Sequence, residues 1–534
     1  MNTLPLLSLV VFTPWIGAAV LAFLRGNSPT TTRALTLAFS LSTLALSVLL
    51  LTQFDPNSLS PQFVERHTWI SALNVHYHLG LDGLSLLLVL LTGILTPLAL
   101  LASWSFFSPS PPLSSSPSSA SAPRLFGSLF LLIQGAALGV FLALDFFHWF
   151  LFWELSLVPA FFLIKLWGGP GAPRAAYQFV VYTIGGSAFM LVGFAALFVA
   201  TGTLDFTQLA QLGRDGTLAA KLPGGAHEVV FLGVLLGFAV KVPLWPFHTW
   251  LPATYAEAPT GASMFLTGVM SKMGVYGCLR ILWPIFPAPL HNAAPWLIAL
   301  ALGGVVFGAF AAMKQTDLKR MVAYSSINHL SYCLLALFAV SYATGRNVAT
   351  GPAASAALSG TLLQMFNHGL SAAALFACVG VFQTRKAHAI SLPSGTGVPP
   401  VSLHDFGGVR TPAPIFAGLC GISLFSSLGL PGLNGFVGEF LIFRGVFGLH
   451  TAAAAIATLG LLVTALFLLT FWQRVFHGPR AGVTATAFSD LNPIELATLL
   501  PLVALMAVFG LFPGLLTSLF NPLITSWADH LTLP

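Results

Sequence analysis

Six ionisable side chains lie inside stretches of the chain that are otherwise apolar. These six are Glu154, Lys241, Lys272, His329, His368 and Glu439. A lysine or a carboxylic acid at mid-membrane depth costs about 3 kcal/mol on insertion scales, so it persists where it pairs, meets water or moves ions. Each histidine taken by itself is better explained as a hydrogen-bonded residue of helix packing. The lysines and glutamates are therefore the stronger candidates for a functional site.

The chemistry that these groups suit is proton transfer. Burial disfavours the charged form of both a lysine and a glutamate, so each can take up and release a proton near neutral pH. A nearby carboxylate stabilises a charged lysine, and moving or neutralising that carboxylate lets the lysine give up its proton. The pattern predicts a Glu154–Lys241 pair that acts as an electrostatic switch. The other four groups are expected to form a hydrated relay that ends at Glu439.

Lys241 stands directly before an interruption of its helix. The apolar stretch 235–252 carries this lysine and is broken by Pro243 and Pro246. A proline removes a backbone donor, and a membrane tolerates the freed carbonyls only where protein or a water-filled cavity satisfies them. The break and the charge together make this stretch the expected centre of the site.

A second apolar stretch with one charge is interrupted in the same way. In 426–443, Pro431 and Gly432 lie ahead of Glu439. Interrupted helices in corresponding positions of two halves indicate an inverted-repeat transporter with its ion site at the breaks. Two unrelated proline kinks are the alternative. The repeat interpretation predicts two units of five helices each.

The composition indicates an integral membrane protein. The 534 residues are 56% hydrophobic and only 7% charged, with a mean hydropathy of +0.87. No soluble domain of this size carries so few charges. The net charge of +6 is spread singly over the loops, which excludes a nucleic-acid-binding surface. The first apolar stretch lacks a basic segment and a cleavage site, so we expect a retained span rather than a signal peptide.

Hydrophobic runs predict an all-α fold with fourteen spans. Their approximate limits are 4–24, 33–52, 83–103, 125–144, 147–168, 176–201, 228–250, 258–283, 295–313, 321–342, 355–383, 413–447 (broken), 452–477 and 493–513. The predicted units are an N-terminal part with helices 1–3 and a Ser/Pro-rich loop, two five-helix repeats, and a C-terminal helix with a tail. They cover 1–124, 125–283, 295–477 and 478–534.

The loop charges predict an orientation. Thirteen Lys and Arg residues fall in the odd-numbered loops and six in the even-numbered loops, which with Lys241 and Lys272 accounts for all 21. The positive-inside rule then places the odd loops in the cytoplasm and both termini outside. An even number of spans independently requires the two termini to share a side.

Other features suggest no further chemistry. Segments 108–124 and 385–412 are rich in Ser, Pro and Gly and are predicted to be disordered, with GTGVPP at 395–400 as linker. No run typical of a strand is evident, and HYH at 76–78 is assigned to a loop. The four cysteines lie in apolar segments without metal-ligand spacing, and His329 and His368 lie on different spans, so no metal site is expected. No hydrolase triad stands out either.

Several motifs together resemble the antiporter-like, proton-translocating subunits of respiratory complex I, which are related to Mrp-type cation antiporters. The resemblance covers about 76–480. It rests on GLDGLSLLLVLLTG (80–93), LDFFHWFLFWELSLVPAFFL (144–163), KVPLWPFHTWLP (241–252), EAPTGASMFLTGVMSKMGVYGCLR (257–280), QTDLKRMVAYSSINHLSY (315–332), FNHGLSAAALF (366–376) and GLPGLNGFVGEF (429–440). This combination is highly specific.

The resemblance implies fourteen core helices, two inverted five-helix repeats, and a path from the Glu154–Lys241 pair through Lys272. A glutamate at position 439 is typical of the M-type subunit. The chain would then pump protons as part of an NADH:quinone oxidoreductase in the bacterial inner membrane, beside L-type and N-type subunits. It would hold no cofactor itself, and NADH, FMN, iron–sulfur clusters and quinone would be bound by partner subunits.

Some features depart from this family, and other functions stay open. Ala253 and Tyr255 follow TWLP where aspartate and then histidine are usual, and Glu257 replaces a common glutamine. The inserts 108–124 and 388–403 are longer than is usual in the family and have no assigned role. The alternatives are a subunit of a Mrp-like cation/proton antiporter, a membrane partner for inorganic-carbon uptake, or a spacer subunit that has lost pumping.

Overall fold

A computed structural model describes residues 4–24, 28–107, 122–344, 351–390 and 400–529, without the side chains of 486, 487 and 529. Much of the two segments rich in Ser, Pro and Gly, 108–121 and 391–399, lies outside these ranges, and with it most of GTGVPP. The disorder of 108–121 and 391–399 therefore stays a prediction. For the described parts it is wrong, because α4 begins at Ala122, α17 continues to Ala389, and Phe406–Gly407 forms the strand β3.

The described chain is almost entirely helical, which confirms the predicted fold class. The N-terminal part contains α1 (Leu6–Phe23), α2 (Pro29–Gln53), β1 (Gln62–Ile70), η1 (Ser71–Leu73), β2 (Val75–Leu81), α3 (Gly83–Ala102) and η2 (Trp104–Phe107). The next part contains α4 (Ala122–Leu142), α5 (Phe146–Leu155), α6 (Leu157–Trp167), α7 (Ala172–Thr201), α8 (Phe206–Arg214), α9 (Thr217–Lys221), α10 (Ala226–Lys241), α11 (Leu251–Glu257), α12 (Thr260–Phe265), η3 (Leu266–Met270), α13 (Lys272–Gly277), η4 (Cys278–Leu282) and α14 (Trp283–Ile285).

The second half continues the same architecture. It contains α15 (Pro287–Met313), α16 (Leu318–Ala343), α17 (Gly351–Ala389), β3 (Phe406–Gly407), α18 (Pro414–Ser427), α19 (Asn434–Leu449) and α20 (Thr451–Phe476). The chain then passes through β4 (Ala481–Gly482), α21 (Val483–Ala487), α22 (Pro493–Leu511), α23 (Gly514–Thr517) and α24 (Asn521–Asp529). The short strands β3 and β4 pair with each other in antiparallel fashion.

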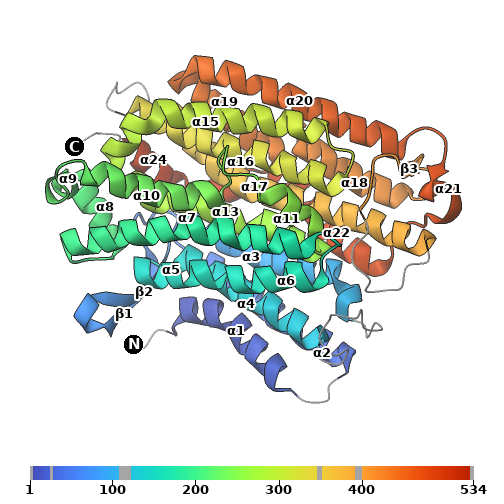
Figure 1. Ribbon diagram of the computed structural model, residues 1–534, viewed down its shortest axis with the longest axis horizontal. Helices are drawn as coiled ribbons and strands as arrows, with labels where there is room; N and C mark the ends of the chain where they lie inside the picture. The colour runs from blue at the N-terminus through green and yellow to red at the C-terminus, as the bar shows by residue number, and fades with distance from the viewer. Residues whose placement is uncertain (1–3, 25–27, 108–121, 345–350, 391–399, 530–534) are drawn as a thin grey trace.

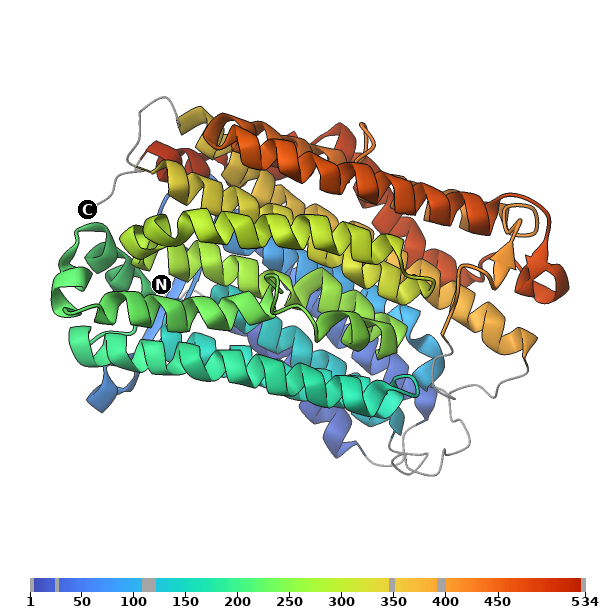
Figure 2. The same ribbon diagram turned by 45° about the horizontal axis from the view of Figure 1, so that its top comes forward.

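The helices lie side by side as one bundle, with α1 and α2 along one edge and α20 along the opposite edge (Figures 1 and 2). The buried fraction of the helices increases toward the middle of the bundle. The most apolar windows of α16 and α17 are 94% buried, whereas those of α2 and α22 are 28% buried. An apolar helix with so little cover is suited to lipid or to a partner helix. The central helices are the ones that carry the candidate site.

Eleven helical segments of the described chain are long and apolar enough to cross a membrane, counting α5 and α6 as one. The other three predicted spans are interrupted in the structure. The span at 228–250 divides into α10 and a non-helical segment, the span at 413–447 divides into α18 and α19, and the span at 258–283 contains the π-helical turns η3 and η4. These irregular segments coincide with the charges inside the bundle.

Four of the aspartates cap the beginnings of helices. Side-chain oxygens of Asp82, Asp145, Asp205 and Asp317 accept backbone N–H groups at the first turns of α3, α5, α8 and α16, respectively. The first turn of a helix leaves such donors without intrahelical partners, so a capping carboxylate stabilises it. These acids are therefore explained by helix capping, unlike Glu154 and Glu439.

The expectation that the chain contains no strand is wrong. Strands β1 and β2 form an antiparallel hairpin, with Arg66 opposite His78 and His67 opposite Tyr77, so the predicted loop at 76–78 is also wrong. The strand residues mix charged, aromatic and aliphatic types without a clean alternation, which hides the period-two pattern. The hairpin is held against α1, where the Glu65 carboxylate accepts the backbone N–H of Leu7 at 2.8 Å.

Candidate functional site

The first break leaves Lys241 at the end of α10. Pro243 has no N–H to bond the carbonyl of Ala239, and the N–H of Leu244 donates to that carbonyl instead at 2.7 Å. The carbonyl of Val240 accepts the indole N–H of Trp250 at 2.9 Å. The broken helix thus satisfies its own freed carbonyls, as an irregular segment inside a membrane must.

Lys241 is enclosed but makes no hydrogen bond. Its side chain is 2% exposed, and among the described residues its Nζ has no hydrogen-bond partner. The ammonium lies 4.8 Å from the centre of the Trp153 ring, which provides cation–π stabilisation. The indole is itself fixed by a hydrogen bond to Ser187 Oγ at 3.0 Å. The lysine is held by an aromatic face rather than by an anion.

Glu154 lies next to that tryptophan on α5 and acts on Lys241 electrostatically. No ion pair at 4.0 Å or less joins the two side chains in the described chain, and the buried Oε1 of Glu154 has no hydrogen-bond partner. The two charges are therefore near each other but not in contact. This spacing suits a partner that modulates the lysine without fixing it, as the sequence predicted for the pair.

Lys272 begins α13 directly after the π-helical turn η3. The wider turn is shown by the bond from the backbone N–H of Ser271 to the carbonyl of Leu266 at 3.0 Å. Lys272 is 0% exposed, and its Nζ donates to the carbonyl of Thr267. Its second contact is with Nδ1 of His368 on α17, at 2.9 Å. The π-turn thus supplies a backbone acceptor for a fully buried amine.

The two histidines stand next to each other between Lys272 and Glu439. The rings of His368 and His329 are 5.1 Å apart between centroids. The Nδ1 atom of His329 lies 2.9 Å from Oε1 of Glu439. All three side chains are 5% exposed or less. Each histidine thus contacts an ionisable group directly, His368 with Lys272 and His329 with Glu439.

The second break positions Glu439. The break falls between α18 and α19. There the N–H of Leu430 donates to the carbonyl of Phe425, five residues earlier, at 3.0 Å, and Leu244 makes the same kind of bond in the first break. Gly432 has a φ of +93°, which favours glycine. The two predicted breaks at Pro243–Pro246 and Pro431–Gly432 are therefore both non-helical, with a similar local bond.

Asparagine side chains fasten the second break to α17. The amide of Asn367 donates to the carbonyl of Asn434 at 2.7 Å, and the amide of Asn434 donates back to the carbonyl of Asn367 at 3.3 Å. Asn434 also accepts the hydroxyl of Ser426 at 2.6 Å. This exchange fixes the start of α19 next to His368, which follows Asn367 directly.

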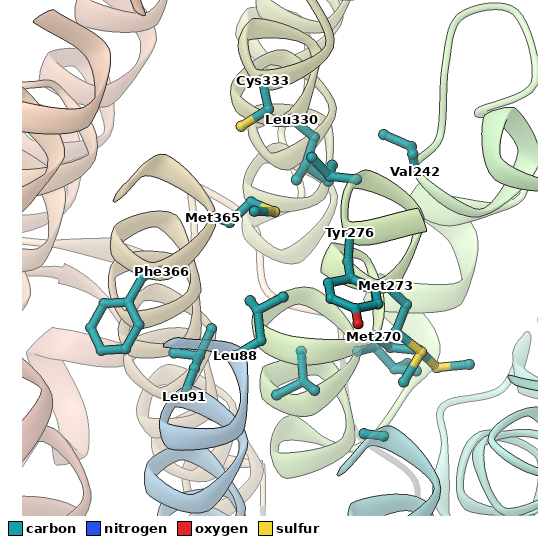
Figure 3. Close-up of a cluster of buried hydrophobic side chains, with 14 of the residues drawn as sticks. Leu88, Leu91, Val242, Met270, Met273, Tyr276, Leu330, Cys333, Met365 and Phe366 are labelled. Atoms are coloured by element: carbon teal, nitrogen blue, oxygen red, sulfur yellow. The ribbon is translucent and has the colours of Figure 1, made fainter. Parts of the chain in front are cut away.

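Apolar side chains enclose the polar groups. Figure 3 shows Met270 and Met273 from the α12–α13 region, Leu330 from α16 and Leu88 from α3 gathered in one buried cluster, with Val242 from the first break near them. A methyl group added to Gly274 would lie 2.6 Å from the Val242 side chain, so α13 packs closely on the break. The residues next to Lys241 and Lys272 in sequence therefore take part in a low-dielectric core.

Two site residues were missed in the sequence. Gln364 donates to Oε1 of Glu439 at 3.3 Å; its position four residues before His368 on one helix face could have indicated it. Lys319, assigned above to a loop, lies in the first turn of α16, is 2% exposed and donates to the carbonyl of Ala258 at 2.6 Å. The predicted span at 321–342 leaves Lys319 in a loop, which is wrong because α16 begins at Leu318, three residues before that span.

Four of the six predicted residues thus form one series of contacts, namely Lys272, His368, His329 and Glu439. Glu154 and Lys241 form a separate group at the first break. In the described residues no cluster of three or more His, Cys, Asp or Glu side chains is arranged to hold a metal ion.

Comparisons with known proteins identify the family of the chain. The family described as "NADH:quinone oxidoreductase/Mrp antiporter, TM" matches residues 143–466, which is more than half of the chain. The chain belongs to this family. Its relatives include NADH-quinone oxidoreductase subunit M of Rhodobacter capsulatus, 34% identical over 529 residues that cover 97% of this chain and 95% of the relative. Subunit M of Mycobacterium tuberculosis is also 34% identical, with coverage of 98% and 94%.

Solved structures of the family share the fold. A chain of respiratory complex I from Thermus thermophilus superposes with a TM-score of 0.82 at 27% identity, covering 98% of this chain and 99% of that chain. A chain of the Mrp complex from Dietzia sp. DQ12-45-1b has a TM-score of 0.78 at 19% identity over 98% and 97% of the two chains, which shows a common fold alone. The resemblance inferred from the sequence motifs is confirmed.

Proposed function

We propose that the chain is the proton-translocating M-type membrane subunit of an NADH-quinone oxidoreductase. The observation that carries the proposal is the buried series from Lys272 through His368 and His329 to Glu439, with a contact between every pair of neighbours. Such a series has no structural advantage over apolar packing, since each buried ionisable group costs free energy. The relatives named subunit M and the shared complex I fold support this reading.

Proton transfer along the series follows from its atoms. A charged Lys272 only donates, so Nδ1 of His368 accepts its proton as the N–H bond of the lysine breaks. His329 donates through Nδ1 to Glu439, while its buried Nε2 has no hydrogen-bond partner among the described residues. As His368 takes up the lysine proton at Nδ1, its Nε2–H bond breaks while an N–H bond forms at Nε2 of His329, and the Nδ1–H bond of His329 then breaks as an O–H bond forms on Glu439. Each step forms one O–H or N–H bond and breaks another.

The Glu154–Lys241 group is proposed as the switch that loads this series. With the carboxylate charged and near, Lys241 keeps its proton; when Glu154 moves away or is neutralised, the lysine releases it toward Lys272. Lys241 can move for this purpose because no hydrogen bond among the described residues holds its Nζ. Redox energy from elsewhere in the complex would drive the movement.

The proposal also specifies the membrane and the neighbouring subunits of the chain. We infer that it lies in the bacterial inner membrane beside L-type and N-type subunits, with the lipid bilayer around it and both termini outside. The units 125–283 and 295–477 are proposed as the two inverted repeats, each centred on one break. Electron transfer from NADH to quinone, and the FMN and iron–sulfur clusters that it needs, belong to partner subunits in this proposal.

A cation/proton antiporter subunit is the second candidate, because the Mrp complex shares the fold. One experiment distinguishes the two functions. The tagged chain is extracted in a mild detergent, sized under native conditions and assayed for NADH-dependent quinone reduction. Co-migration with a large assembly that contains flavin and iron–sulfur clusters is expected. A small, colourless assembly without redox activity would contradict the proposal and favour the antiporter.

A further inference from the structure

The ring that holds Lys241 is itself held by a hydroxyl of another helix. Trp153 is 1% exposed, and Ser187 on α7 is 2% exposed. The indole N–H of Trp153 donates to Ser187 Oγ at 3.0 Å, and the Lys241 ammonium lies 4.8 Å from the centre of the same ring. A side chain of α7 is thus connected to the lysine of α10 through a tryptophan of α5.

A glycine brings α7 close to α10 at this level. A methyl group added to Gly186 would lie 3.0 Å from the Val240 side chain. Gly186 directly precedes Ser187, and Val240 directly precedes Lys241. Small residues let the backbones of two membrane helices approach closely and so fix their packing. The hydroxyl of Ser187 therefore keeps a defined place relative to the helix that carries the lysine.

Ser187 bonds differently from the neighbouring hydroxyl of its own helix. Thr183, one turn earlier and 3% exposed, donates to the carbonyl of Phe179 at 2.7 Å. Such a bond within the helix is the ordinary choice for a hydroxyl in an apolar helix. The hydroxyl of Ser187 accepts a bond from α5, so it acts between helices, and Thr183 offers a matched comparison.

The hydrogen bond adds a direction to the packing of the indole. Trp149 stacks on Trp153 with ring centroids 4.7 Å apart, and Phe238 meets it edge-on at 5.8 Å. Such ring contacts locate the indole. The bond to Ser187 specifies where its N–H edge points, because hydrogen bonds weaken steeply when they are bent. It thereby also determines which face the ring offers to Lys241.

The competing partner of Lys241 is the carboxylate of Glu154, the residue after Trp153. This carboxylate acts on the lysine electrostatically, and its buried Oε1 has no hydrogen-bond partner among the described residues. In a low-dielectric core a direct ion pair is stronger than the contact of an ammonium with a ring. The ring therefore keeps the lysine near the carboxylate but off its oxygens only while the indole holds its position.

We propose that Ser187 is a positioning residue of the Glu154–Lys241 switch, whose hydroxyl holds the Trp153 indole so that Lys241 rests on the ring and not on the carboxylate. Without this bond the indole turns and the ammonium moves onto Glu154. A direct, charge-assisted pair then releases its proton more slowly. This inference rests on the proposed function and deepens it, because it names what sets the resting distance between the two charges.

The first test is the position of the lysine in Ser187→Ala. Cryo-EM maps of the whole purified complex, at a resolution that shows side chains in this subunit, are compared for the variant and the wild type. We expect Lys241 Nζ over the Trp153 ring in the wild type and within ion-pair distance of Glu154 in the variant. An ammonium that stays over the ring in Ser187→Ala would overturn the proposal.

The second test is NADH-driven proton pumping by the whole complex in vesicles, for Ser187→Ala and Thr183→Val. Each substitution removes one buried hydroxyl of α7, but only Ser187 bonds the indole. We expect the coupled rate to fall about fivefold in Ser187→Ala, the size expected for the loss of one hydrogen bond, and to stay near wild type in Thr183→Val. Equal rates in the two variants would contradict the positioning role.

Further variants keep the outcome readable. If Ser187→Ala does not assemble, Trp153→Phe replaces it in both tests, because it keeps a ring and removes the N–H group. Its control is Trp296→Phe, since Trp296 on α15 is 78% exposed. Lys241→Ala tests the switch itself. Lost pumping in Lys241→Ala with normal pumping in Ser187→Ala would overturn the positioning role alone, whereas normal pumping in Lys241→Ala would overturn the proposed switch.

Discussion

The imidazole of His329 lies 2.9 Å from the carboxylate of Glu439 and so joins α16 directly to the helix that follows the second break. The carboxylate also accepts the amide of Gln364 at 3.3 Å. Glu439 is thus held by the imidazole of His329, which can carry a proton, and by the amide of Gln364, which cannot. The following predictions start from this pair.

Replacement of Glu439 by lysine should impair transport without abolishing it. The new amine can still carry a proton, but it lies beside His329 and makes protonation of that ring less favourable. We expect the rate of NADH-driven pumping to fall about tenfold, compared with a larger loss in Glu439→Gln, which cannot take up a proton at all. The exposed Glu228 on α10 gives a control, Glu228→Lys. Equal rates in Glu439→Lys and wild type would remove Glu439 from the relay.

Lys241→Ala should abolish pumping and strongly slow coupled turnover while the complex still assembles. Among the described residues the amine has no hydrogen-bond partner, so its removal costs the contact with Trp153 and the packing of the buried stem but leaves no partner unsatisfied. Loss of a proton carrier is expected to lower the coupled rate on the order of 10²-fold. Proton uptake into vesicles and native gels measure the two effects, with Lys221→Ala, on the exposed helix α9, as the control. Wild-type pumping in Lys241→Ala would refute the assigned axis.

Glu154→Gln should be nearly as damaging as loss of the lysine. The substitution keeps the volume and removes the charge that acts on Lys241. The same vesicle assay and assembly gel apply, and Glu228→Gln is the matched control. A fully coupled Glu154→Gln enzyme would reduce Glu154 to a packing residue.

Tyr255→Phe should perturb Lys272 from a distance. The fully buried Tyr255 hydroxyl donates to the carbonyl of Leu266 at 3.0 Å, at the start of the π-turn that leads to the lysine. Loss of one such bond costs about 1 kcal/mol, and we expect a lower melting temperature together with slower pumping. Tyr182→Phe removes a partly exposed hydroxyl that bonds Thr249 at 2.8 Å and serves as the control. Unchanged pumping in Tyr255→Phe would show that the π-turn keeps its shape without this bond.

Asp205 should make stability depend on acid pH. Burial raises the pKa of its carboxyl, but hydrogen bonds from His78 and the backbone and the charges of His78 and Arg66 outweigh this, so the pKa lies below its usual value. A lowered folded-state pKa contributes stability above the unfolded value near pH 4, and this stability is lost as the pH falls further. Thermal melts of wild type and Asp205→Asn between pH 3 and 7 measure the effect. The wild type should lose its advantage below about pH 4; parallel curves would contradict the assignment.

The sequence was sufficient for much of the site because charges are rare in this chain. Lys241, Lys272 and Glu439 stand out against their apolar neighbours, and Pro243 and Pro431 mark the breaks beside them. Contacts between helices were not predictable in the same way. That His329 and His368 lie together depends on how α16 packs on α17, which no local pattern specifies.

The features that the sequence did not predict have physical causes as well. Strands β1 and β2 are half polar, and the Glu65 carboxylate on β1 holds the hairpin to Leu7 on α1 by a contact across 58 residues of sequence. Lys319 and Gln364 are ordinary polar residues by type, and only their burial gives them significance. No proline occurs in 260–283 to indicate that the π-helical turns η3 and η4 interrupt the predicted span at 258–283.

The absence of a hydrogen bond at Lys241 has a consequence for energy conservation. A continuous proton wire across a charged membrane would let protons flow back, since each carries about 2.3 kcal/mol per 100 mV. Among the described residues, contacts run from Lys272 to Glu439, with a ring contact rather than a hydrogen bond between the two histidines, whereas Lys241 Nζ has no hydrogen-bond partner. In the proposed function, this gap protects a resting subunit from leak, and conduction would require Lys241 to leave the face of Trp153.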